Sequence, residues 1–216
     1  MSIDAMRRQY QHAPLDDAHL DADPISQFRH WFSEAVEANP APDWNEPNVM
    51  TLATVKPGGA VTSRILLLKG VDQRGFVFYT NYDSDKGREL AENPVAAMNF
   101  FWPHLARQVR IEGRVEKLPR AESEAYFASR PRGSQLGAWA SPQSEVIESR
   151  EQLEQDLAEV QERFAKADPI PCPPHWGGYV LRPEQVEFWA GRENRLHDRI
   201  RFVLADGQWR RRRLAP

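Results

Sequence analysis

The stretch RQVRIEGRVEKL, residues 107–118, predicts more of the fold than any other part of the sequence. In it Val109, Ile111, Gly113 and Val115 alternate with polar residues, and this period of two is typical of a strand with one buried face. Other runs rich in β-branched and aromatic residues are also predicted to be strands: 48–55, 60–68, 76–81, 95–102, 177–190, 198–206 and 208–216. The turn sequences KPGG (56–59) and VDQRG (71–75) separate the first of these strands.

Helical spacing and capping residues predict a few helices among these strands. Asp23 and Pro24 give an N-cap and a first helical residue, and Asn39-Pro40 ends the helix that they begin. Further helices are predicted over 84–93, 119–130 and 149–167. Sequential antiparallel strands with a few helices predict a mainly β member of the α+β class, built on a barrel. We expect one domain over residues 23–216, preceded by a mobile arm of residues 1–22.

Composition narrows the possible functions. The chain has 216 residues, 41% of them hydrophobic, and a net charge of −3, so a site for a polyanion would have to be local. Four successive arginines at 210–213 do not outweigh this balance, and we expect no nucleic-acid partner. The single cysteine, Cys172, has no partner for an internal disulfide and no signature of a nucleophile around it. With no secretory signal and no apolar run of about 18 residues, we expect a cytoplasmic protein without a membrane partner.

Several cationic residues stand where an anion would explain them. Arg64 shares a strand face with Leu66 and Leu68, so its charge needs an anionic ligand, a carboxylate or a route to solvent. Lys69 ends the same strand and Lys86 begins a predicted helix, where phosphate binding is favourable. An isolated lysine at such a place is also compatible with simple solvation.

Two further clusters leave a functional and a structural reading open. In YFASRPRGSQLGAW (126–139), the residues Tyr126, Arg130 and Ser134 suit a phosphate monoester, but also a helix end followed by a loop. In FWAGRENRLHDRI (188–200), three arginines surround His197 and would repel one another unless an anionic or electron-rich ligand joined them. No paired Cys/His set or HExxH motif predicts a metal, and no GxGxxG, Walker or GxSxG motif is present.

Segments from most of the chain together resemble the pyridoxine/pyridoxamine 5′-phosphate oxidase family. They are RRQY (7–10), RILLLK (64–69), FYTN (78–81), RQVRIEG (107–113), YFASRPRGSQLGAW (126–139), WGGY (176–179), EFW (187–189), RLHDR (195–199) and RLAP (213–216). The resemblance implies an FMN-dependent homodimer with an FMN-binding split β-barrel fold and peripheral helices. It also implies oxidation of pyridoxine or pyridoxamine 5′-phosphate to pyridoxal 5′-phosphate, with O2 reduced to H2O2.

Residues at matching positions take expected roles from this resemblance. The cofactor-binding residues would be Arg64 and Lys86 at the FMN phosphate, Ile65, Leu66, Leu67, Leu68, Lys69, Tyr79 and Thr80 along the flavin, Gln108 at the isoalloxazine edge, and Gln143, Ser144, Trp189 and Arg199 delivered across the dimer. The substrate-binding residues would be Lys69, Tyr126, Arg130 and Ser134 at the substrate phosphate, Arg195, Leu196 and His197 at the pyridine ring, and Arg7, Arg8, Gln9 and Tyr10 in an arm that folds over the substrate. Arg195 and His197 would be the catalytic residues that orient the substrate, and no metal is implied.

One position departs from the family pattern. The family usually has an arginine just before the lysine of the FMN-phosphate site, whereas this chain has Asp85. An acid near a phosphate favours weaker FMN retention unless it turns away or caps the helix that begins there. Two alternatives to the oxidase stay open at this point: another split-barrel FMN reductase, and a non-catalytic carrier of pyridoxal phosphate.

Overall fold

The computed structural model describes residues 2–3, 15, 20–40 and 46–216. The strands are β1 (Val49–Val55), β2 (Val61–Leu67), β3 (Gly70–Asp72), β4 (Gly75–Asn81), β5 (Val95–Trp102), β6 (Arg107–Lys117), β7 (Trp176–Ala190), β8 (Asp198–Ala205) and β9 (Gln208–Leu214). The helices are α1 (Pro24–Glu37), α2 (Asp85–Glu92), α3 (Arg120–Ser129), α4 (Arg132–Ala140) and α5 (Arg150–Arg163), with a short 3-10 helix, η3, at Glu193–Arg195. No helix among the described residues is long and apolar enough to cross a membrane.

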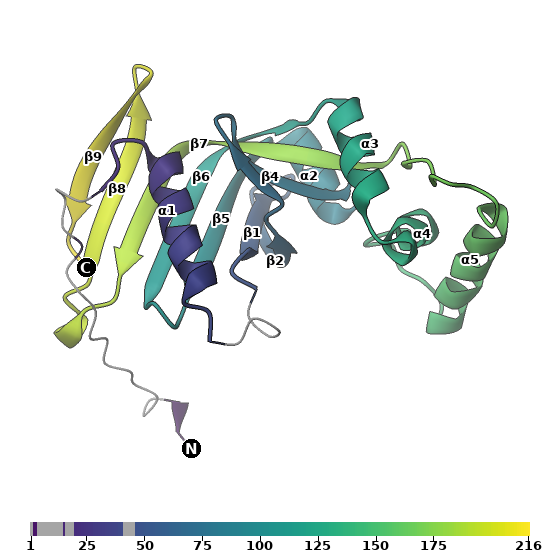
Figure 1. Cartoon of the computed structure of the whole chain (residues 1–216), viewed down its shortest axis with the longest axis horizontal. Coiled ribbons are helices and arrows are strands. Elements are labelled where there is room, and N and C mark those ends of the chain that lie inside the picture. Colours follow the sequence, from purple (N-terminus) through teal and green to yellow (C-terminus); the bar gives the residue numbers. More distant parts are fainter. Residues whose placement is uncertain (1, 4–14, 16–19, 41–45) are drawn as a thin grey trace.

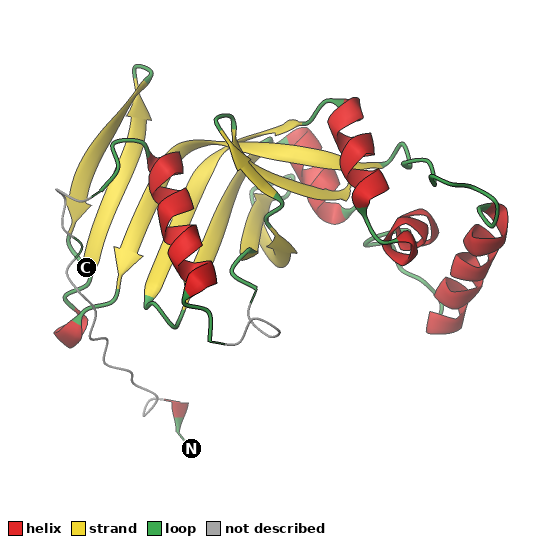
Figure 2. Cartoon of the chain, viewed as in Figure 1, coloured by secondary structure: helices red, strands yellow, loops and turns green. Residues whose placement is uncertain are grey.

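The strands form one curled antiparallel sheet in the order β2-β1-β5-β6-β7-β4-β3, and β8 and β9 extend it beyond the second half of β7 (Figure 1). The helices lie around this sheet, with α3, α4 and α5 gathered at one end (Figure 2). This mainly β, half-barrel architecture confirms the predicted fold class. Most of the predicted arm lies outside the described residues, although Leu15 and Leu20 pack against the core.

The long strand β7 organises the sheet because it has three partners. Its first half pairs with β4, its second half pairs with β8, and β6 pairs with it along nearly its whole length. The alternation in β6 is as predicted: Val109, Ile111 and Val115 are buried in the core. At Gly113 the pairing shifts register at a β-bulge, which lets one strand bend around the core.

Helix α1 covers the buried face of the sheet. Asp23 caps the helix through Ser26 N, as predicted, and Pro24 occupies its first turn. Phe28 is fully buried and meets Phe76 and Phe100 edge to face at centroid distances of 4.9 and 5.0 Å. Trp31 meets Phe188 in the same way at 5.1 Å. Helix α1 therefore packs on one face of the sheet and does not cover the other.

Segment 177–190 is part of one continuous strand, as predicted, and its pairing with β6 passes over the bulge without a turn. Three features differ from the sequence-based expectation. Gly70–Asp72 is a short strand paired with β4, so the predicted turn at 71–75 begins later. Segment 132–140, which the sequence left open as a loop, is helix α4, and the helix predicted over 149–167 ends at Arg163.

We expect Gly113→Ala to destabilise the protein, since a Cβ at this position would lie 2.0 Å from the backbone oxygen of Arg182. Such overpacking against backbone typically costs about 1–3 kcal/mol of the free energy of unfolding. Gly133→Ala is the matched control, because a Cβ there has no neighbour within 4 Å and alanine favours the helix. Urea unfolding at fixed protein concentration tests the pair. Equal midpoints for Gly113→Ala and the unmodified protein would show that the bulge does not need glycine.

Candidate active site

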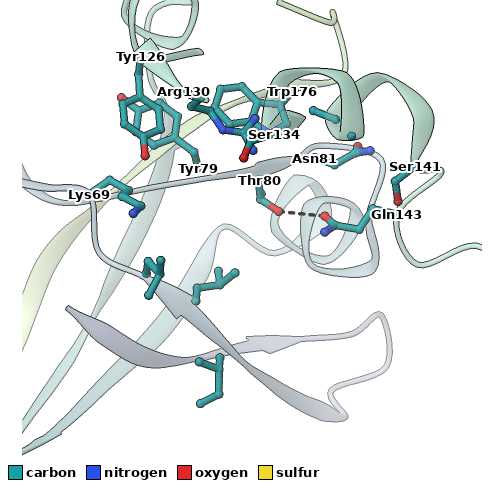
Figure 3. Close-up of a pocket in the computed structure, with 15 residues that line it drawn as sticks. Lys69, Tyr79, Thr80, Asn81, Tyr126, Arg130, Ser134, Ser141, Gln143 and Trp176 are labelled. Atoms are coloured by element: carbon teal, nitrogen blue, oxygen red, sulfur yellow. Dashed lines mark hydrogen bonds between the residues drawn. The ribbon is translucent and has the colours of Figure 1, made fainter. Parts of the chain in front are cut away.

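A cavity of about 510 Å3 lies at the end of the sheet where β2, β4 and β7 meet α3 and α4 (Figure 3). Its walls are formed by Ile65, Leu66, Leu67, Lys69, Tyr79, Thr80, Asn81, Tyr126, Arg130, Ser134, Gly137, Ala138, Ser141, Gln143 and Trp176. All four residues expected at a substrate phosphate, and six of the seven expected along a flavin, therefore line the same space. The seventh, Leu68, is buried in the core instead. Asn81 and Trp176 also line the cavity; they lie in the segments FYTN (78–81) and WGGY (176–179) quoted for the resemblance, which assigned neither residue a role.

Arg130 is the most informative cation in this cavity. It caps the C-terminal end of α3, and its guanidinium carbon lies 4.6 Å from the centroid of the Trp176 ring. Its Nη1 is buried without a hydrogen-bond partner in the described part of the chain, and burial lowers the pKa of the guanidinium. A buried donor of this kind is costly unless a ligand accepts from it. Arg130 is thus prepared for an anion that enters the cavity.

Aromatic rings close one side of the cavity. Tyr79 and Tyr126 are stacked with their centroids 3.9 Å apart, and Tyr79 also stacks on Trp176 at 5.4 Å. The rings come from β4, α3 and β7, so strand pairing and helix packing together hold them in place. Ser134 lies in the first turn of α4, beyond the Pro131 that begins this helix. The position of Ser134 therefore depends on α4, which the sequence did not predict.

Lys86 lies beside the cavity and is buried, with 6% of its surface exposed. Its Nζ donates to Thr80 Oγ1 at 3.1 Å, Ser84 Oγ at 3.0 Å and Gln143 Oε1 at 3.1 Å, all neutral oxygens. It forms no ion pair with any described residue. Burial, and then the nearby Arg64 charge, lower the pKa of Lys86 to about 8. An anion beside Nζ would compensate this buried charge.

Arg64 forms an ion pair with a carboxylate of its own chain. Its Nη2 lies 3.2 Å from Oε2 of Glu89 on α2, a residue that is 4% exposed, and the guanidinium also donates to Thr54 and Thr62. Of the partners considered from the sequence, the carboxylate is therefore the one that the structure contains. Glu89 escaped notice because nothing in its helix pattern indicates which strand it will face. A role for Arg64 at a phosphate stays a prediction.

The carboxylate of Asp85, the residue before Lys86, pairs with Arg88. Asp85 Oδ1 accepts from Arg88 Nη2 at 2.8 Å, and Arg88 Nη1 donates to Glu145 at 2.8 Å, while Ser84 caps the helix. An acid in the first turn of a helix is favourable, and its pairing with Arg88 moderates its repulsion of an incoming anion. Glu145 lies in the loop that also carries Gln143 and Ser144. Ser144 has a left-handed backbone with φ of 74°.

A second group of expected site residues lies on the outer face of β6, β7 and β8. Gln108 pairs with Trp189, and Trp189 pairs with Arg199, so the three form one row across three strands. The next residues inward, Val109, Phe188 and Ile200, are fully buried on the other face. We call Gln108, Trp189 and Arg199 the outer row.

His197 and Arg195 lie next to the outer row. The rings of His197 and Trp189 are 4.7 Å apart, and His197 Nδ1 accepts from the backbone N–H of Arg192 at 3.0 Å. Asn194 and Arg195 both have left-handed backbone, with φ of 54° and 62°. Two successive strained residues of this kind often mark a functional site. Leu196 is exposed, and Arg7, Arg8, Gln9 and Tyr10 lie outside the described residues.

Within one chain the cavity and the outer row are separate. None of Gln108, Trp189, Arg195, His197 and Arg199 lines the cavity. In Figure 1, β8 and η3 lie at one end of the sheet, whereas α2, α3 and α4 lie at the other. Gln143, expected to arrive across a dimer, already contacts Lys86 of its own chain, whereas Gln108 stands with the outer row.

Comparison with known proteins finds similar proteins along nearly the full length of the chain. It is 57% identical to the pyridoxine/pyridoxamine 5′-phosphate oxidase of Pseudomonas paraeruginosa over 215 residues, covering 100% of this chain and 99% of the relative. It is 55% identical to the Salinibacter ruber protein of the same name, covering 98% of this chain and 97% of the relative. Among solved structures, PhzG from Burkholderia lata, in complex with tetrahydrophenazine-1-carboxylic acid, superposes with a TM-score of 0.85 at 31% identity, covering 92% of this chain and 95% of that one.

Two family models together match most of the chain. Residues 37–164 match the pyridoxamine 5′-phosphate oxidase model, which alone spans more than half of the chain. Residues 176–216 match the model of the pyridoxine 5′-phosphate oxidase C-terminal dimerisation region, which contains β7, β8 and β9 and so the greater part of the outer row. With these matches and relatives more than half identical over their full length, the chain belongs to the pyridoxamine 5′-phosphate oxidase family.

Proposed function

We propose that this protein is an FMN-dependent oxidase that converts pyridoxine or pyridoxamine 5′-phosphate to pyridoxal 5′-phosphate and reduces O2 to H2O2. The observation that carries the proposal is the convergence of Lys69, Tyr126, Arg130 and Ser134 in one cavity with stacked aromatic rings. Two cationic groups and two hydroxyls suit a phosphate monoester, and the rings suit a planar heterocycle beside it. The names of the full-length relatives support the same substrate class.

The residues present fit FMN. Lys86 is a buried cation whose partners among the described residues are neutral, and a phosphate would supply its missing counter-charge. Thr80 and Gln143, which already contact Lys86, line the cavity and are available to the same ligand. When bound, FMN supplies the two-electron acceptor that the oxidation requires and that O2 regenerates. The protein supplies binding, orientation and exclusion of water.

The substrate phosphate is assigned to the Arg130 end of the cavity. The unpartnered Nη1 of Arg130 would donate to a phosphate oxygen, and the planar guanidinium keeps its orientation by stacking on Trp176. Ser134 and Tyr126 add hydroxyl donors from the two helices on either side of Pro131. If Lys69, Tyr126, Arg130 and Ser134 hold the phosphate, the rest of the substrate extends toward the ends of β2 and β4 that line the cavity.

The outer row comes from a second copy in this proposal. One chain holds the cavity and the outer row at opposite ends of its sheet, so a homodimer is the arrangement that brings a cavity against a partner's row. The match to a C-terminal dimerisation region supports this. Gln108, Trp189 and Arg199 would then contact the flavin ring, and Arg195 and His197 the substrate. The cytoplasmic location expected from the sequence stays a prediction.

His197 is proposed to act as a neutral donor. Its Nδ1 accepts from Arg192 N–H, so the proton of the neutral ring resides on Nε2. Burial, and then the Arg195 charge, lower the pKa of His197 below its usual value, which keeps the ring neutral near pH 7. An Nε2–H in this state can donate to a polar group of the substrate without adding a third full charge beside Arg195 and Arg199.

A visible spectrum taken before and after anaerobic pyridoxine 5′-phosphate tests the proposed function. We expect the protein to bind FMN, the flavin absorbance to fall on addition of substrate, and air to restore it with pyridoxal 5′-phosphate in solution. Arg130→Met should leave FMN binding unchanged and raise KM for the phosphorylated substrate about 100-fold, since it removes a charge-assisted contact.

Other outcomes of this experiment would replace the proposal. A flavin that stays oxidised with the substrate but loses absorbance with a reduced nicotinamide would identify a reductase. Binding of pyridoxal 5′-phosphate without any FMN binding would identify a carrier. A carboxylate substrate oxidised in preference to a phosphorylated one would align the chain with its PhzG neighbour, whose solved structure holds a carboxylic acid.

The pH dependence of FMN binding tests the role of Lys86. Since its pKa is lowered to about 8, Lys86 loses its proton as the pH rises through that value, whereas bound phosphate favours the protonated amine. The dissociation constant for FMN should therefore increase above pH 8, by up to about tenfold per pH unit. Lys86→Gln should bind FMN more weakly and without this rise, whereas Lys117→Gln, an exposed lysine outside the cavity, should keep it. The same rise in Lys86→Gln would contradict the assignment.

A further inference from the structure

A buried carboxylate, Glu187, lies next to the outer row, on the same face of the sheet and two residues before Trp189 on β7. It is 3% exposed, and its Oε1 lies 2.8 Å from Arg199 Nε and 2.7 Å from Arg199 Nη2. Its Oε2 accepts from Arg201 Nη2 at 3.2 Å and lies 3.9 Å from Arg110 Nη1. Among the described residues, Oε1 thus contacts Arg199 alone.

Strand register explains why these groups meet. Arg110, Glu187 and Arg201 pair across β6, β7 and β8, so they form a second row on the same face as the outer row, two residues along each strand. Arg199 stands opposite Trp189 and reaches diagonally to Glu187, a distance that a long side chain spans on a sheet surface. Arg199 Nη1 also donates to the carbonyl oxygen of Ala215 at 3.0 Å. The guanidinium is therefore held from two sides.

The composition of this second row indicates more than a contribution to stability. Three guanidiniums surround one buried carboxylate, and Arg201 Nε is buried without a partner in the described chain. An ion cluster that served stability alone would be expected to satisfy its buried donors. Arg110 has a second acid, Glu112, at 3.0 Å, so Glu187 is not needed to neutralise it. The closest contacts of Glu187 are those that fix Arg199.

We infer that Glu187 is a positioning residue for FMN binding: it holds the Arg199 guanidinium in the orientation in which the outer row meets the flavin. This inference rests on the proposed function. A free arginine loses rotamer freedom when it binds a ligand, and a buried carboxylate that orders it beforehand removes part of that cost. Because the shortest contacts of Glu187 are to Arg199, we expect its effect on FMN binding to pass through Arg199.

A double-mutant cycle on FMN binding tests the inference without measuring turnover. The dissociation constant is measured by flavin fluorescence quenching for the unmodified dimer, Glu187→Ala, Arg199→Ala and the double variant. We expect Glu187→Ala to weaken FMN binding about tenfold and to add nothing in the Arg199→Ala background. A purely structural role for Glu187 would give additive effects in the double variant, and additivity would overturn the inference.

Further variants keep the test decisive. Glu187→Gln keeps the oxygen acceptor but loses the charge, so it should weaken FMN binding less than Glu187→Ala. In the Arg199→Ala background it should again have no further effect. It replaces Glu187→Ala in the cycle if that variant fails to fold. Glu112→Ala removes an acid from the same sheet face and should leave FMN affinity unchanged. If Arg199→Ala weakens binding and neither Glu187 variant does, the inference fails while the proposed function stands. If the unmodified dimer does not bind FMN, the proposed function fails first.

Discussion

The pairing of one long strand with three others is the constraint on which the rest of this structure depends. Strand β7 has 15 residues, and its first half is bound to β4 while its second half is bound to β8. At about 3.3 Å per residue this strand extends roughly 50 Å. Trp176 at its beginning lines the cavity, and Glu187 and Trp189 near its end lie in the outer-face rows. The cavity and the outer row are thus kept apart in one chain, and in the proposed function they meet across a dimer.

The site handles its buried charges in two different ways. Glu187 is fully compensated by arginines that neighbouring strands bring alongside, so it fixes geometry before any ligand arrives. Lys86 and Arg130 are left with neutral partners or with an unpartnered donor, and burial lowers the pKa of each. Buried cations without a counter-charge reduce the stability of the folded chain, and a bound phosphate would supply that counter-charge. In the proposed function, phosphate binding is therefore favoured because folding leaves the positive charges of Lys86 and Arg130 without an acidic partner among the described residues.

Much of the fold was predictable from local pattern, whereas the pairing of charges was not. The period of two in residues 107–118 and the Asp23 cap are local signals, and both are confirmed. Helix α4 escaped prediction because Pro131 and two glycines resemble a loop, while its stability comes from packing against α5. Glu187 looked like an ordinary polar residue on a strand, because its burial depends on arginines that only the long-range register of β6 and β8 places beside it. The resemblance to a family supplied the site residues and grouped them by ligand, but it gave no role to Glu89 or Glu187, the buried acids that pair with Arg64 and Arg199.

Complementation between two variants with impaired FMN binding tests most directly whether the site is built from two copies. Lys86→Gln disables the cavity side and Arg199→Ala the outer row, and a purified heterodimer of the two retains one site with both sides intact. The account predicts that this heterodimer regains about half of the activity of the unmodified dimer with pyridoxine 5′-phosphate, since one of its two symmetric sites is complete. Activity no higher than that of either parent would show that the cavity and the outer row do not meet across a dimer.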